Sequence, residues 1–264
     1  LQWCDMASFD FLRTVLTNPE DHPYLLLIGA YRHNEVDSSH PLTKLIARAK
    51  AGGSPVEEIR LERLAPVHCQ EMVSYILDTQ FSRTEALSAF LVDLTEGNPL
   101  FVSESLSYLY NEDLLFVDDK MQWRWDLERI RQSNMPSSVV ALFSAKILKL
   151  PPASIDVLQR FACMGNTVSP DDLALVSDLS LAEMFELLKP ALGSGLIIEN
   201  RGNLQFIHDR VQEAVLASIP LKRRRQIHWQ VGQKLLSMVP EGVDVEGVDN
   251  LFAIVSHLNL GKPS

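Results

Sequence analysis

The chain of 264 residues is long enough to bury the cores of two or three small domains. Its composition, 46% hydrophobic and 22% charged, is ordinary for a globular protein. A formal net charge of −10 argues against nonspecific attraction to nucleic acid or to an anionic membrane surface. The longest apolar run, YLLLIGAY, is far shorter than the roughly 20 residues of a membrane-spanning helix, so we expect no membrane insertion of this stretch.

The three cysteines, Cys4, Cys69 and Cys163, are far apart and lie in no CxxC or Cys/His pattern. This spacing predicts buried free thiols rather than disulfides or metal ligands. Free thiols are typical of a reducing compartment, so we expect a cytoplasmic protein without a metal site of its own.

The first 65 residues alternate helical and strand-like patterns. The opening LQWCDMASFDFL is no signal peptide, and Ser8 is placed to cap a helix over residues 9–16. We therefore expect the sequence to begin in the middle of a domain. After the turn-forming TNPEDHP, the continuous apolar run at 24–32 predicts a parallel strand buried on both faces. A helix at 42–49 and a second strand at 56–64 follow, and ligands bind at the carboxyl ends of such strands.

The middle of the chain is predicted to be helical. Three helices are expected at about 67–79, 83–95 and 99–110, with EGNP as the break before the third. Two short β-type runs around DDK at 118–120 predict a hairpin, and SSVVALFSAKILKL at 137–150 predicts another helix.

The region from residue 152 to 219 has the order expected of a winged helix. Helices are predicted at 154–163, 170–176 and 181–192, and a hairpin follows whose turn is NRGN at 200–203. Amphipathic helices at 210–219, 223–239 and 250–260 come next at repeat-like spacing, and PEGVDVEGVD predicts an exposed loop between the last two.

Several of these stretches together resemble one family, the AAA-like P-loop ATPases of the signal-transducing STAND class. LQWCDMASFDFL resembles the segment after their Walker B acids, LLLIGAYRHNEV their sensor strand, LTEGNPLFVSE their lid motif and FIHDRVQEAV their winged-helix His-Asp motif. WRWDLERI, VVALFSAKILKLP and LFAIVSHLN further resemble the ATPase region of large bacterial-type proteins with a serine/threonine-kinase-like domain before it and a sensor histidine kinase after it.

The resemblance implies two catalytic positions. It implies that Arg32, which closes the sensor strand, reads the terminal phosphate, because a guanidinium can bind phosphate through two hydrogen bonds. A surface salt bridge with Glu35 is the alternative interpretation. Asp5 matches the second acidic position of the motif, where it orients water or a partner side chain. The alternative for Asp5 is a residue at the entry to the helix near Ser8.

Five further residues correspond to nucleotide-binding positions of the family. Gly97, Asn98 and Pro99 resemble the motif that packs against adenine, although simple helix punctuation would need the same residues. His208 and Asp209 resemble the pair whose imidazole touches the diphosphate, with Ile207 in place of the methionine of the best-known version. A histidine that caps the junction between wing and helix is the alternative.

The central part of a nucleotide site is absent from this sequence. No G-x-x-x-x-G-K-[ST] phosphate loop occurs, and the magnesium-binding acids of the family would precede Leu1. We therefore expect ATP or ADP with Mg²⁺ to be cofactors of the full-length protein and not to be bound tightly by this chain alone.

The winged-helix region is also compatible with two other functions, phosphoacceptance and DNA binding. HDRVQEAV also resembles the phosphoacceptor helix of a histidine-kinase class, but here the histidine follows a β-like run instead of lying within a long helix. A DNA-binding winged helix would need basic or amide side chains on its recognition helix, and LAEMFELLKP offers Glu183 and Glu186. The basic run at 222–225 is more typical of a solvated face or an intramolecular contact.

The sequence thus predicts a mainly α chain with a partial α/β P-loop core. The expected parts are the end of that core at 1–65, a helical lid with a small hairpin at 66–135, a winged-helix domain at 136–219 and the start of a TPR-like region at 220–264. The implied function is an ATP-dependent signalling switch whose partners are flanking kinase domains of the same polypeptide, with self-association possible and no nucleic acid bound. A non-catalytic interaction scaffold is the main alternative.

Overall fold

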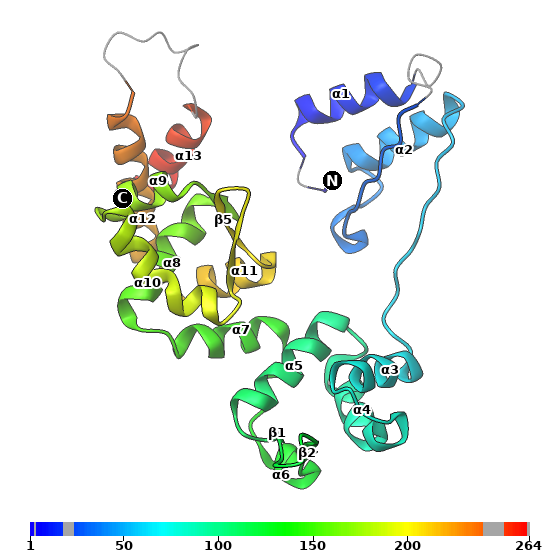
Figure 1. Ribbon diagram of the computed structural model, residues 1–264. Coiled ribbons are helices and arrows are strands. Elements are labelled where there is room, and N and C mark those ends of the chain that lie inside the picture. Colours follow the sequence, from blue (N-terminus) through cyan, green and yellow to red (C-terminus); the bar gives the residue numbers. More distant parts are fainter. Residues whose placement is uncertain (3, 18–23, 240–250, 263–264) are drawn as a thin grey trace. The chain divides into compact units, whose positions relative to one another are not determined.

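The protein is described from a computed structural model that covers residues 1–2, 4–17, 24–239 and 251–262. Two predicted loops, at 18–23 and 240–249, lie outside the described residues, as does Trp3. The described chain is mainly helical and forms two compact units, Leu1–Glu62 and Arg63–Ser264 (Figure 1). No helix in the described part of the chain is long and apolar enough to cross a membrane.

The first unit has a small core between two helices. It contains α1 (Met6–Thr17), the short 3-10 helix η2 (His33–Glu35) and α2 (Pro41–Ala51). Phe9 of α1 packs against Leu42 and Leu45 of α2, and all three side chains are buried. The predicted helix at 42–49 is confirmed, whereas the first helix begins three residues earlier than expected, because Asp5 and not Ser8 accepts the capping hydrogen bond.

The two predicted strands of this unit are not formed. Residues 25–32 and 56–64 form no strand and pair with no other strand in the described part of the chain (Figure 1). A buried parallel strand needs neighbours on its edges and helices on its faces. The described residues of this unit supply no neighbouring strand, and although Tyr31 packs against the core of the two helices, other apolar side chains of the first stretch stay exposed, as at Leu26 (80% exposed) and Ile28 (86% exposed).

The second unit begins with four helices and a hairpin around one core. These are α3 (Pro66–Ile76), α4 (Phe81–Thr95), α5 (Pro99–Asn111), the antiparallel strands β1 (Leu115–Val117) and β2 (Trp123–Trp125), and α6 (Leu127–Gln132). Asp118 forms the turn of the hairpin, since its carboxylate accepts from the N–H groups of Lys120 and Gln122, both at 2.9 Å. The three predicted helices and the predicted hairpin are therefore present.

The next part packs helices against a three-stranded antiparallel sheet. It contains α7 (Val139–Leu148), α8 (Pro152–Met164), β3 (Thr167–Val168), α9 (Pro170–Ser177), α10 (Leu181–Gly193), β4 (Ile197–Asn200), β5 (Asn203–Phe206) and α11 (Asp209–Ala217). The strand order is β3-β5-β4, and Phe161 of α8 stacks on Phe206 of β5 at 4.2 Å between ring centroids. Arg201 and Gly202 both have positive φ in the hairpin turn, as a type I′ turn requires.

Two helices end the described chain, α12 (Leu221–Ser237) and α13 (Leu251–Gly261), and they pack closely against each other. The two helices approach closely at two glycines. A Cβ atom on Gly232 would lie 2.8 Å from the Leu258 side chain, and a Cβ atom on Gly261 would lie 2.3 Å from the Trp229 backbone nitrogen. One side of α12 shares a small core with α8 and α9, through Ile227 and Val231 against Cys163 and Val176. The predicted helices at 223–239 and 250–260 are thus present.

Candidate functional site

Asp5 is the N-terminal cap of α1. One of its carboxylate oxygens accepts from the Ser8 backbone N–H at 2.7 Å, and the other accepts from the Ser8 hydroxyl at 3.2 Å. The backbone hydrogen bond from Ser8 is the main cause that lowers the pKa of this exposed carboxyl. These contacts fit the interpretation of Asp5 as a helix-entry residue, and its catalytic role stays a prediction.

Arg32 lies at the end of the extended apolar stretch, beside the opening segment of the chain. Its guanidinium Nη1 forms an ion pair with Glu35 Oε1 at 2.8 Å, which is the salt bridge offered as the alternative to phosphate sensing. The Leu1 amino group donates to the Ala30 carbonyl at 2.7 Å, so the segment that leads to Asp5 runs past this stretch. Asp5 and Arg32 therefore belong to the same unit, while phosphate recognition by Arg32 stays a prediction.

The turn formed by Gly97, Asn98 and Pro99 joins α4 to α5. Asn98 caps α5 by accepting from the Phe101 N–H at 3.1 Å, and Pro99 occupies the first turn of that helix. Gly97 has a φ of +74°, and a Cβ atom there would lie 2.3 Å from the Leu64 carbonyl oxygen. The Leu64 N–H also donates to the Gly97 carbonyl at 2.8 Å, so the turn is fixed to residue 64 by backbone contact. These residues therefore end α4 and begin α5, and contact with adenine stays a prediction.

His208 and Asp209 lie where the hairpin meets α11. The His208 Nδ1 accepts from the Arg210 N–H at 3.1 Å and caps the helix, while the Asp209 carboxylate lies 2.6 Å from the same ring nitrogen. Both side chains are partly exposed. The histidine precedes α11 rather than lying within a long helix, which does not fit a phosphoacceptor helix. Contact with a diphosphate stays a prediction.

The acidic residues of α10 are occupied by local contacts. Glu183 and Ser180 form a capping box, in which the Ser180 N–H donates to Glu183 at 2.9 Å. Glu186 pairs with Lys189 at 2.6 Å. This surface therefore carries carboxylates where a DNA-reading helix would present donors to base edges.

Sequence reasoning missed a buried histidine pair between α12 and α13. The Nδ1 atoms of His228 and His257 are 2.9 Å apart, and the two side chains are 7% and 8% exposed. Burial, the neighbouring His257 and the Arg224 charge lower the pKa of His228 to about 4, and burial also lowers the pKa of His257. Both rings are therefore neutral at pH 7, and one N–H donates to the other ring. QIHWQVG and VSHLNLG carry these residues, but only the packing of the helices pairs them.

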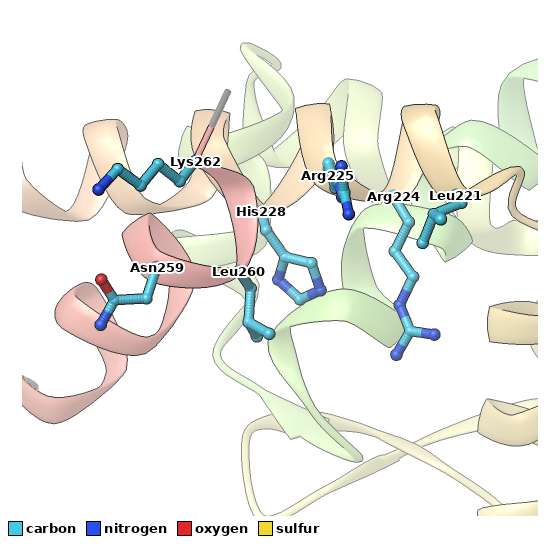
Figure 2. Close-up of a pocket in the computed structure, with 7 residues that line it drawn as sticks. All are labelled: Leu221, Arg224, Arg225, His228, Asn259, Leu260 and Lys262. Atoms are coloured by element: carbon cyan, nitrogen blue, oxygen red, sulfur yellow. The ribbon is translucent and has the colours of Figure 1, made fainter. Parts of the chain in front are cut away.

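A pocket of about 580 Å³ opens beside this pair (Figure 2). It is lined by Leu221, Arg224, Arg225 and His228 of α12, by Asn259 and Leu260 of α13, and by Lys262 just beyond α13. The sequence signal was the basic run at 222–225, which by itself predicts only a solvated face. No group of three or more possible metal ligands occurs among the residues that the structure describes.

Comparison with known proteins points to signalling. No family model matches the chain. The chain is similar to the hybrid signal transduction histidine kinase G of Dictyostelium discoideum, with 26% identity over 252 aligned residues that cover 80% of this chain. The aligned region is 7% of the length of that protein. The similarity supports a signalling role for this chain and relates it to a kinase signalling protein.

Proposed function

We propose that this chain is the nucleotide-dependent switch region of a large, cytoplasmic, multidomain signalling protein, and that kinase domains of the same polypeptide are its partners. The observation that carries the proposal is the similarity to a hybrid histidine kinase across 80% of the chain, although the match takes up only 7% of that protein. Because the match is a small part of that protein, we propose that this region likewise lies among other domains of one polypeptide and links them.

The exposed apolar stretches of the first unit support a partial P-loop core. Four consecutive large apolar side chains at 25–28 are between 44% and 86% exposed, although their sequence is typical of a strand buried on both faces. We propose that residues 24–32 and 56–64 pair with further strands of an α/β core in the complete protein. That core would also supply the phosphate loop and the acids that hold Mg²⁺ with ATP or ADP.

The order of elements in the second unit supports the assignment of the remaining parts of the switch. The helix and strand order from α8 to β5, with sheet order β3-β5-β4, fits a winged-helix domain within 136–219. The helices at 66–135 would form the lid, and α12 with α13 would begin a TPR-like region. ADP would hold core, lid and winged helix closed, and exchange for ATP would shift the population toward an open arrangement that the kinase domains sense.

Nucleotide binding tests this proposal. Fluorescent analogues of ATP and ADP are titrated into the full-length protein and into this chain alone, and only the full-length protein is expected to bind tightly. In the full-length protein, Arg32→Ala should reduce the preference for ATP over ADP by about tenfold, the size of one charge-assisted hydrogen bond. Arg13→Ala is the matched control, since this arginine also pairs with an acid three residues away, at 3.1 Å.

Three results would contradict the switch: tight ATP binding by this chain alone, no nucleotide binding by the full-length protein, or an equal effect of the two arginine substitutions. The second of these would favour the scaffold. One observation already agrees with a scaffold, since Asp5, Asn98 and His208 each cap a helix and need no nucleotide to explain them.

A further inference from the structure

The residues that line the pocket between α12 and α13 have no role in the proposed switch. Figure 2 shows Arg224 and His228 leaving α12 on the same side, with Leu260 of α13 beside the His228 ring. Asn259 and Lys262 lie at the end of α13. The pocket therefore combines cationic side chains, one amide and two leucines, and its volume of about 580 Å³ is within the range of small-molecule sites.

The positive charge of this pocket is uncompensated by the described residues. Three of its seven lining residues, Arg224, Arg225 and Lys262, are cationic and none is acidic, in a chain whose net charge is −10. None of the three side chains forms a hydrogen bond or an ion pair with a described residue. Arg224 is half-buried and close enough to His228 to help lower its pKa. A bound anion would give the Arg224 guanidinium a charged partner, which it lacks among the described residues.

Neighbouring cations of α12 behave differently. Arg223 pairs with Asp156 of α8 at 2.5 Å, and Lys234 pairs with Asp178 after α9. These pairs hold α12 to the preceding helices, whereas the cations of the pocket point to no acid. The basic run at 222–225 thus contains residues with distinct roles, and the charges at 224 and 225 are available for a ligand.

We propose that this pocket binds a small organic phosphate. The forked guanidinium groups of Arg224 and Arg225 match phosphate oxygens. Leu221 and Leu260 offer apolar contact to the organic part. A metal ion is disfavoured at the histidine pair, because the charge of Arg224 acts on His228.

Calorimetric titration of the whole 264-residue chain with phenyl phosphate tests the assignment. One saturable site is expected, with tighter binding of phenyl phosphate than of inorganic phosphate because of the two leucines. Arg224→Gln and Arg225→Gln should each weaken binding by about tenfold or more, the effect of one hydrogen bond to a charged group. Lys222→Gln is the matched control, since it removes a cation from the same helical turn but lines no part of the pocket, and it should change affinity less than twofold.

Absence of saturable binding would overturn the proposal, as would an equal loss of affinity in Lys222→Gln, which would reduce the effect to diffuse charge. Equal affinity for phenyl phosphate and inorganic phosphate would overturn the organic part of the assignment. Circular dichroism of each variant verifies that the fold is retained. Phenyl phosphate has no nucleoside, so the outcome is independent of whether the full-length protein binds ATP.

Discussion

The buried pair of His228 and His257 makes the packing of α13 on α12 sensitive to acid. In the folded chain the pKa of His228 is about 4, compared with 6.5 for an unperturbed histidine. The unfolded helix pair therefore takes up a proton at a pH where the folded pair does not. The stabilisation is fully present above pH 6.5 and is lost as the pH falls from 6.5 to 4.

The size of the effect follows from the same two values. At about 1.4 kcal/mol per pH unit, the pKa difference corresponds to roughly 3 kcal/mol of free energy for opening the helix pair. That is a change of about two orders of magnitude in the equilibrium constant for opening. Asp156, which binds Arg223 of α12, does not share this window, because hydrogen bonds from its two arginines outweigh burial and keep its pKa below 3.8.

Two NMR measurements between pH 7.5 and 4.5 test this prediction. The imidazole ¹⁵N shifts should show that His228 titrates near pH 4 and that the pKa of His257 lies below 6.5. Amide protection in α13, corrected for intrinsic exchange, should fall as the pH is lowered. In the double variant His228→Gln with His257→Gln this dependence should vanish, while His68→Gln, which alters an exposed histidine on α3, should keep it. The reasoning fails if either ring titrates near 6.5 or if the double variant retains the wild-type pH dependence.

Two further substitutions probe backbone and ion-pair contacts. Gly97→Ala should lower the free energy of unfolding by about 2–4 kcal/mol, because of the positive φ at this residue, the clash with Leu64 and the lost hydrogen bond. Urea unfolding measures this loss. The control Gly202→Ala should lose less, because Gly202 has a positive φ but no atom near its added Cβ. Asp156→Asn should weaken the ion pair with Arg223, which lowers the stability of α12 by about 0.5–2 kcal/mol and speeds amide exchange in that helix. The wild-type chain in 1 M salt should show part of the same effect, because salt screens the ion pair.

Local signals explain which parts of the fold could be predicted. The hairpin of β4 and β5 depends on Arg201 and Gly202, which adopt the positive φ that the turn needs, and α10 depends on the capping box of Ser180 and Glu183. Each of these features acts over four residues or fewer, so the sequence displays it directly.

The formation of strands and the assembly of the site between α12 and α13 depend instead on residues that are far apart in the sequence. A strand exists only when another strand lies beside it, so the apolar pattern at 24–32 predicts burial that the described chain does not provide. The start of α1 was misplaced because Asp5 and Ser8 are both good caps, and their mutual hydrogen bond decides between them. His228 and His257 are 29 residues apart, and no local rule pairs them.

The turn at Gly97 holds the residue at which the chain enters the second unit's core. The first unit ends at Glu62 and the second begins at Arg63, and the N–H of the next residue, Leu64, donates to the Gly97 carbonyl. In the proposed switch, movement of the first unit would reach this turn through the backbone, whether or not this glycine touches adenine. Asn98→Ala, which removes the cap of α5 but leaves the Leu64 contact, separates the two roles. If switching is lost in Gly97→Ala and retained in Asn98→Ala, the backbone link carries the signal.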